Sequence, residues 1–256
     1  MSKILIANWK MNPEKETDAI KLAKATDGEH VVICPPLPFL SEVSTAINKS
    51  ALGAQDISTD PITGPFTGEV SASQLRSMGI QYVIIGHSSR RSRDGETDEI
   101  VAKKIAAALD AGLIPILCVG ETATERSHGH TREVLDRQLR MAFSLIPADT
   151  GEKKFNVIVA YEPVWAISTN QAPGAGGHSE GATPSMVQDM ISYMKGIVRG
   201  MPITPVFIYG GSVDAENLGS FLECSEIHGA LVGAVSLKAG EFKKMIVVAS
   251  QSNINN

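Results

Sequence analysis

The sequence lacks the features that mark secreted, membrane-spanning or nucleic-acid-binding chains. Its 256 residues hold only three cysteines, Cys34, Cys118 and Cys224, and this odd number does not suit a disulfide framework. No apolar run is long enough to span a bilayer, and the amino terminus has no signal-peptide core. The formal net charge of −5 argues against nucleic acid or an anionic membrane as the main partner. We therefore expect a soluble, cytoplasmic protein.

Low-complexity segments and linkers are also missing. Hydrophobic residues make up 43% of the chain and charged residues 20%, which is a globular composition. No composition shift divides the chain, so we expect one domain over residues 1–256. The polar tail at 250–256 is predicted to be frayed.

Short apolar runs recur along the whole chain, and each has about the length of a strand. They are ILIAN (4–8), HVVICPP (30–36), SALGAQ (50–55), YVIIGH (82–87), IPILCVG (114–120), NVIVAYE (156–162), PVFIYGG (205–211) and GALVGA (229–234). Because their apolar residues are continuous and do not alternate with polar ones, these runs indicate strands that are buried on both faces.

Segments with helical spacing lie between these runs, at 99–112, 131–146 and 184–200. Thr183 is a suitable amino-terminal cap before Pro184, and Gly112 and Gly200 stand where helices should end. Eight strand–helix units in about 250 residues predict a closed (β/α)8 barrel with parallel strands. The alternative, an open doubly wound sheet, usually has a glycine-rich turn after its first strand. Here that strand ends in Asn8-Trp9-Lys10.

Polar side chains end several of the predicted strands. Asn8 and Lys10 follow the first strand, His87 ends the fourth and Glu162 ends the sixth. Taken singly, each has an ordinary structural explanation. In a barrel, however, the carboxyl ends of all strands meet on one rim, where such residues are usually functional.

Small-residue turns follow the last two strands, at 210–212 and 233–234. Such turns bind phosphate when a helix amino terminus follows them, and otherwise serve as tight turns. Residues 213–217 read as a short helix with an acidic first turn, so a phosphate site is expected at this point.

Several segments resemble the signatures of the triosephosphate isomerase family, in that family's order and spacing. They are ANWKMN (7–12), GAQDIS (53–58), GPFTGE (64–69), GHSSRR (86–91), PILCVGET (115–122), AYEPVWAI (160–167), YGGSV (209–213) and LVGAVSL (231–237). The resemblance covers essentially the whole chain. It implies a (β/α)8 barrel that interconverts dihydroxyacetone phosphate and glyceraldehyde 3-phosphate in glycolysis and gluconeogenesis, without organic cofactor or metal.

The resemblance also implies roles for the residues at the strand ends. Glu162 is the base, and His87 is an uncharged donor to the developing oxyanion, a pair of roles for which this family is a standard example. Lys10 supplies positive charge and Asn8 orients the substrate. Ser168, Ser212, Gly233 and Ala234 bind the substrate's phosphate.

A lid and a subunit interface follow from the same resemblance. Residues Pro163, Val164 and Trp165 form the hinge of the lid, and Tyr209 and Glu121 form its latch, with the Trp165 indole donating to Glu121. For Glu121, a helix first-turn charge is an equally good explanation. Phe66 and Thr67 lie in a protruding loop that inserts into a neighbouring subunit, so a homodimer is expected.

The sequence departs from the family's pattern at several places. Ser89 replaces a glutamate that organises the nearby lysine and arginine, for which Glu69 or Glu121 could compensate. Ser168 and Asn170 replace glycines of the lid, and Ala234 replaces a second glycine. Residues 171–181 lengthen the connection after the lid and read as a flexible insertion.

These departures keep two alternatives open: a catalytically weakened phosphate-binding barrel, and an isomerase of a longer sugar phosphate. Elsewhere, His128 and His130 have a metal-like spacing without an acidic or cysteine partner nearby in sequence, so no metal site is expected there.

Overall fold

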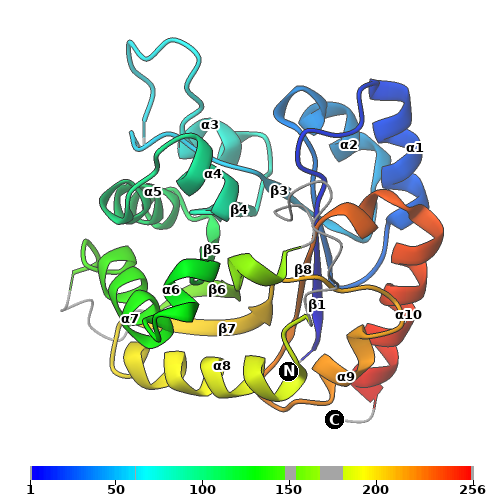
Figure 1. The fold of residues 1–256 in the computed structure, drawn as a ribbon. Coiled ribbons are helices and arrows are strands. Elements are labelled where there is room, and N and C mark those ends of the chain that lie inside the picture. Colours follow the sequence, from blue (N-terminus) through cyan, green and yellow to red (C-terminus); the bar gives the residue numbers. More distant parts are fainter. Residues whose placement is uncertain (1, 61, 148–153, 168–180, 255–256) are drawn as a thin grey trace.

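The computed structural model describes residues 2–60, 62–147, 154–167 and 181–254, and its strands close into one parallel barrel (Figure 1). Each strand pairs with the next in chain order, and β8 returns to β1 with Ala230 opposite Leu5. The closure confirms the predicted (β/α)8 barrel and excludes the open doubly wound sheet. The strands are β1 Ile4–Asn8, β2 Val31–Cys34, β3 Ala51–Ala54, β4 Tyr82–Ile85, β5 Ile114–Val119, β6 Phe155–Tyr161, β7 Ile203–Tyr209 and β8 Gly229–Val232.

Helices surround the barrel and cover the outer faces of its strands (Figure 1). The three predicted helices are present as α5, α7 and α8, and the Thr183 hydroxyl accepts a hydrogen bond from the Met186 N–H as a cap of α8. Gly112 and Gly200 follow α5 and α8 with φ angles of 75° and 86°, a conformation that glycine adopts without strain. The helices are α1 Glu16–Thr26, α2 Leu40–Ala46, α3 Ala72–Ser77, α4 Ser88–Arg93, α5 Asp98–Asp110, α6 Ala123–Ser127, α7 Thr131–Ala142, α8 Pro184–Val198, α9 Leu218–Leu222 and α10 Ala239–Ile254, with short 3₁₀ turns η1 Leu37–Phe39, η2 Val164–Ala166 and η4 Ala234–Leu237.

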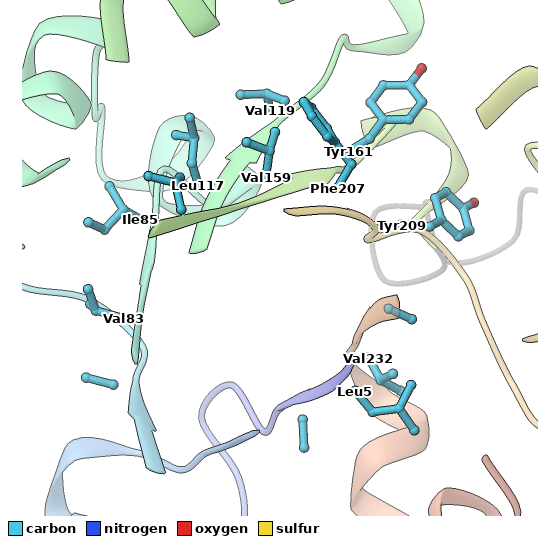
Figure 2. Close-up of a cluster of buried hydrophobic side chains, with 14 of the residues drawn as sticks. Leu5, Val83, Ile85, Leu117, Val119, Val159, Tyr161, Phe207, Tyr209 and Val232 are labelled. Atoms are coloured by element: carbon cyan, nitrogen blue, oxygen red, sulfur yellow. The ribbon is translucent and has the colours of Figure 1, made fainter. Parts of the chain in front are cut away.

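Two apolar clusters explain why the strands read as continuous apolar runs. Alternate residues point inward, where Ile6, Ile84 and Ile208 belong to a cluster that fills the barrel. The remaining residues belong to a larger cluster between the strands and the helices. Figure 2 shows members of this cluster pointing away from the barrel centre, among them Leu5, Val83 and Val159. Both faces of each strand are therefore buried.

Two local predictions differ from the structure. Residues 213–217 form a turn instead of a short helix, and α9 begins only at Leu218. The Asp214 carboxylate accepts the N–H groups of Glu216 and Asn217, and the Asn217 side chain accepts the Asp214 N–H, so side chains replace helical hydrogen bonds here. At the other end, α10 continues to Ile254, through most of the tail for which fraying was predicted.

One connection extends well beyond the body of the molecule. The loop from β3 to α3 projects outward at the upper left of Figure 1, in cyan, and contains Phe66 and Thr67. Across the described parts of the chain, every helix is too short or too polar to cross a membrane.

Candidate active site

A cavity of about 220 Å³ opens at the carboxyl ends of the strands. It gathers the polar side chains that end β1, β4 and β6 together with the small-residue turns after β7 and β8. Its walls are Asn8, Lys10, His87, Glu162, Ile167, Gly210, Gly211, Ser212, Val213, Asp214, Leu231, Gly233, Ala234 and Val235. The structure therefore brings together the amine, imidazole and carboxylate that the strand ends predicted.

Lys10 is held in an unusual backbone conformation. Its φ angle is 53°, in the left-handed region that costs an ordinary residue about 1–2 kcal/mol. The Asn8 side-chain oxygen accepts the Lys10 N–H at 3.0 Å, and Gln55 donates to the Lys10 carbonyl at 2.7 Å and to the Cys34 carbonyl at 2.9 Å. These contacts fix the backbone so that the amine lies beside the cavity. A Cβ atom at Gly233 would lie only 3.8 Å from the Lys10 Nζ.

Glu162 lies on the floor of the cavity and is only 3% exposed. The Glu162 N–H donates to the Val119 carbonyl at 2.7 Å, which continues the hydrogen bonding between β6 and β5. This bond fixes the position of the Glu162 backbone. One carboxylate oxygen is 3.4 Å from the Ser88 N–H, and the other is 3.5 Å from Nε2 of His87. Both contacts are long for hydrogen bonds, so the carboxylate keeps acceptor capacity for a substrate.

Two glycines make room for Glu162. A Cβ atom at Gly120 would lie 1.9 Å from the Glu162 carbonyl oxygen, and one at Gly210 would lie 2.5 Å from its Cγ. The thiol of Cys118 is also close. Burial raises its pKa well above the usual value, and the neighbouring Glu162 carboxylate raises the pKa further. Cys118 therefore stays a neutral thiol beneath the carboxylate.

His87 caps α4 and is 7% exposed. Its Nδ1 lies 3.2 Å from the backbone nitrogen of Ser89 and 2.8 Å from the Ser89 hydroxyl oxygen. Since a backbone N–H can only donate, Nδ1 is an acceptor and the ring hydrogen belongs on Nε2, the nitrogen that faces Glu162.

Trp165, in the 3₁₀ turn η2, donates a hydrogen bond to a buried carboxylate. The Trp165 indole donates to Oε1 of Glu121 at 2.8 Å, as the sequence led us to expect. Glu121 is fully buried, also accepts the Tyr161 hydroxyl, and lies two residues before α6, so it is not a helix first-turn charge. The Arg126 guanidinium lies 4.0 Å from the Trp165 ring centroid and 3.8 Å from Glu121. Burial raises the pKa of Tyr161, and the neighbouring Glu121 carboxylate raises this pKa further.

The turns expected to bind phosphate line the same cavity. Ser212 contacts the Ala166 carbonyl through both its N–H, at 3.3 Å, and its hydroxyl, at 2.8 Å, which ties this turn to η2. Tyr209 is buried and stacks on Phe221 with ring centroids 4.5 Å apart. Ser168, Asn170 and residues 171–180 lie outside the described residues.

The charge of Arg90 is balanced differently from the sequence-based expectation. Arg90 contacts Glu96 at 2.8 Å, Asp56 at 3.0 Å and Asp94 at 3.3 Å. Lys104 joins the same group through Glu96 at 2.5 Å and Asp56 at 2.6 Å. These carboxylates surround Arg90, instead of Glu69 or Glu121. The sequence analysis overlooked Asp94 and Glu96, which follow Arg90 closely, whereas Asp56 is distant in sequence and leaves no local signal.

A second, larger cavity of about 500 Å³ lies beside the first and shares Asn8, Lys10 and His87 with it. Met11, 90% exposed, and Leu37 form part of its rim. Phe66, at 46% exposure, and Thr67 lie on the projecting loop.

Sequence reasoning missed Gln55, although GAQDIS was among the resembling segments. The only available signal was an amide directly after a strand. As for the paired histidines, the rings of His128 and His130 lie 6.3 Å apart, and His130 is 2.7 Å from Glu133, an acidic neighbour that was overlooked. No group of three or more potential metal ligands occurs within the described ranges.

The amino-acid sequence was also compared with those of known proteins, and the matches agree on one family. The sequence model described as triosephosphate isomerase matches residues 3–249. A triosephosphate isomerase of Herminiimonas arsenicoxydans is 40% identical over 258 residues, which cover 96% of this chain and 99% of the relative. Those of Ruthia magnifica and Cupriavidus necator are each 38% identical, over 94% of this chain and 97% and 96% of their own lengths.

Proposed function

The chain belongs to the triosephosphate isomerase family and interconverts dihydroxyacetone phosphate and D-glyceraldehyde 3-phosphate, and we propose that Glu162 transfers the proton between the two carbons. The observation that carries this assignment is a buried carboxylate facing an imidazole, in a cavity that also holds an amine. Glu162 takes the proton from the carbon bearing the hydroxyl, and the electron pair moves onto the carbonyl oxygen to give an enediolate. The proton of the substrate's hydroxyl passes to the enediolate oxygen, and the carboxylic acid returns its proton to the adjacent carbon as the new carbonyl forms.

His87 and Lys10 stabilise the negative charge that develops on the substrate oxygen. Because Nδ1 of His87 is already an acceptor, its ring hydrogen is on Nε2. His87 lines the cavity, so this Nε2–H is available to the substrate. Preorganised donors of this kind act strongly in a site from which water is excluded. Lys10 adds positive charge for the oxyanion and for the phosphate. Asn8 supports Lys10 by accepting its backbone N–H, and it orients the substrate.

The phosphate is held by the turns after β7 and β8, through Ser212, Gly233 and Ala234, together with Ser168 of the lid. Ser212, Gly233 and Ala234 line the cavity, and the Ser212 hydroxyl donates to the Ala166 carbonyl, directly after the proposed hinge. Pro163, Val164 and Trp165 form that hinge, and Tyr209 and Glu121 hold the lid at its two ends. Lid closure keeps water from the enediolate, which otherwise loses its phosphate.

The test is an assay of the purified protein with both triose phosphates, followed by ligand titration. We expect equilibration far faster than in buffer, and binding of a planar enediolate mimic at least about 100-fold tighter than glycerol phosphate. A rate equal to buffer, with both ligands bound equally, would identify a phosphate-binding barrel without catalysis. Faster turnover of a four-carbon homologue would identify a longer sugar phosphate as the substrate.

We also propose a cytoplasmic homodimer in which the loop around Thr67 enters the larger cavity of a second copy. Exposed apolar side chains support this, because Phe66 on the loop and Met11 and Leu37 at the cavity need cover from water. The cavity borders Lys10 and His87, so the partner's loop would complete one wall of the active site. Free thiols at Cys34, Cys118 and Cys224 fit a reducing compartment.

Sedimentation tests the dimer. The wild-type protein should sediment as a dimer at micromolar concentration, and Phe66→Asp should shift it to monomer and lower activity. Val247→Asp, at another exposed apolar residue, is the matched control and should remain dimeric. A wild-type monomer, or dissociation by both variants alike, rejects the loop as the interface.

A further inference from the structure

The side chain of Ser89 contacts the catalytic histidine directly. Its hydroxyl oxygen lies 2.8 Å from Nδ1 of His87, closer than the Ser89 backbone nitrogen at 3.2 Å. The ring is almost fully buried and Ser89 is half-buried, so water competes little for this contact. Two donor groups of one residue therefore converge on one ring nitrogen.

The direction of these hydrogen bonds is fixed by chemistry. The backbone N–H of Ser89 is a donor only, which makes Nδ1 an unprotonated acceptor. A hydroxyl can donate or accept, and beside an unprotonated ring nitrogen it donates. The hydrogen of the neutral ring is therefore on Nε2.

We propose that Ser89 is a positioning residue, whose hydroxyl holds the tautomer of His87 in which Nδ1 accepts and keeps the Nε2–H aimed into the substrate cavity. This inference rests on the proposed function for the role of His87, but the contact itself is independent of it. Because both bonds leave from neighbouring atoms of one residue, they also fix the tilt of the ring.

The surroundings of His87 make such control useful. The charged groups that share its two cavities come from β1, β6, α4 and the loops after β3 and β7. The nearest is the Glu162 carboxylate, whose Oε1 is 3.5 Å from Nε2 and favours the hydrogen on that nitrogen. The carboxylates are Glu162, Asp56, Glu69 and Asp214, and the cations are Lys10, Arg90 and Arg93.

A glutamate, the residue that the family pattern favours at this position, could not make this contact. An ionised carboxylate only accepts hydrogen bonds, whereas the Ser89 hydroxyl donates one to Nδ1. In this chain the charge balance around Arg90 comes from Asp56, Asp94 and Glu96. A carboxylate at position 89 is therefore not needed to pair with Arg90, and the Ser89 hydroxyl can bind the His87 imidazole instead.

The experiment compares Ser89→Ala, which removes the hydroxyl, with Ser89→Thr, which keeps it. Ser127→Ala, at an exposed serine of α6, is the matched control. The ¹⁵N resonances of the His87 ring, measured in the free protein, report which nitrogen carries hydrogen and how strongly Nδ1 is hydrogen-bonded. In Ser89→Ala we expect the Nδ1 resonance to move toward that of unbonded imidazole, and in Ser89→Thr we expect it to return to the wild-type position.

Kinetics give the second readout. The value of kcat should fall about tenfold in Ser89→Ala, with KM changed far less, and should return in Ser89→Thr. Unchanged ring resonances and an unchanged kcat in Ser89→Ala would overturn the proposal. So would hydrogen on Nδ1 of the wild-type ring, a measurement that needs no variant. The spectra require no turnover, so a protein that failed the isomerase assay could still show the Ser89 contact.

Discussion

The two ends of the barrel use charged side chains in opposite ways. At the carboxyl end, Lys10, His87 and Glu162 converge on one cavity, with long contacts of 3.4 and 3.5 Å around Glu162. At the amino end, charged groups bind the backbone of connecting loops at short distance. Lys3 donates to the Ile227 carbonyl at 2.8 Å, and Asp27 accepts the backbone N–H groups of residues 48–50 at 2.7–3.2 Å.

This difference in hydrogen bonding indicates that charged groups at the carboxyl end serve catalysis and those at the amino end serve stability. A carboxylate whose acceptor sites are filled by backbone N–H groups adds to folding and has no capacity left for a substrate. One held loosely, beside a strained Lys10 backbone, costs stability and remains reactive. We therefore expect substitutions at the carboxyl end to lower turnover, and substitutions at the amino end to lower the melting temperature.

Glu162→Asp should have the largest effect. Withdrawing the carboxylate by one methylene, about 1 Å, removes the base from the carbon acid, so kcat should fall roughly 100- to 1,000-fold. The melting temperature should stay within a few degrees, because the long contacts of Glu162 stabilise the fold little. Steady-state kinetics and a thermal melt measure both. A variant that lost stability and kept its rate would reverse the comparison.

Gly210→Ala should come next. Its new Cβ atom would lie 2.5 Å from Cγ of Glu162, so the carboxylate must move aside. A displacement near 1 Å predicts a loss of roughly 100-fold in kcat. Gly181→Ala is the control, since nothing lies within 4 Å of the added atom. Equal rates for the two variants would show that the position of Glu162 is not set by Gly210.

Lys104→Met tests whether an ion-pair network that borders the carboxyl end of the barrel serves stability or turnover. Lys104 is buried against Asp56 and Glu96, and Met leaves both carboxylates without this partner, which should cost about 3 kcal/mol of unfolding free energy. Turnover of the folded variant should change less than threefold. Denaturant unfolding and kinetics decide, with exposed Lys103→Met as the control. If turnover fell far more than threefold while the unfolding free energy stayed unchanged, the network would instead belong to the active site.

The sequence predicts the strands well for a physical reason. Burial on both faces demands continuous apolar runs, and all eight observed strands overlap the predicted ones, with β4 beginning at Tyr82 and β6 ending at Tyr161. Strand ends then predict which side chains share a rim. What a linear reading could not supply is the partner chosen across the fold. Asp56 beside Arg90 and Gln55 beside Lys10 join residues 34 and 45 positions apart, and residues 213–217 form a turn through side-chain hydrogen bonds that compete with a helix.

Asp27→Asn should have the smallest effect and the clearest pH dependence. Burial alone raises the pKa of Asp27, but the N–H groups of Asn48, Ser50 and Lys49 outweigh it and hold the pKa below the usual value. A carboxyl with a lowered pKa stabilises the fold above its unfolded value, about 3.9, and this stabilisation is lost as the pH falls through the folded pKa.

At pH 7, Asp27→Asn should therefore lower the melting temperature by about 2–4 °C for each kcal/mol lost, with kcat unchanged. Between pH 5 and about pH 2 the difference from wild type should shrink, because the wild-type carboxyl becomes protonated. Exposed Asp18→Asn is the control and should show no such convergence. If the Asp27→Asn difference were constant over this range, the charge of Asp27 would contribute nothing to the loop it holds. The contrast between the two ends would then lie only in hydrogen-bond geometry.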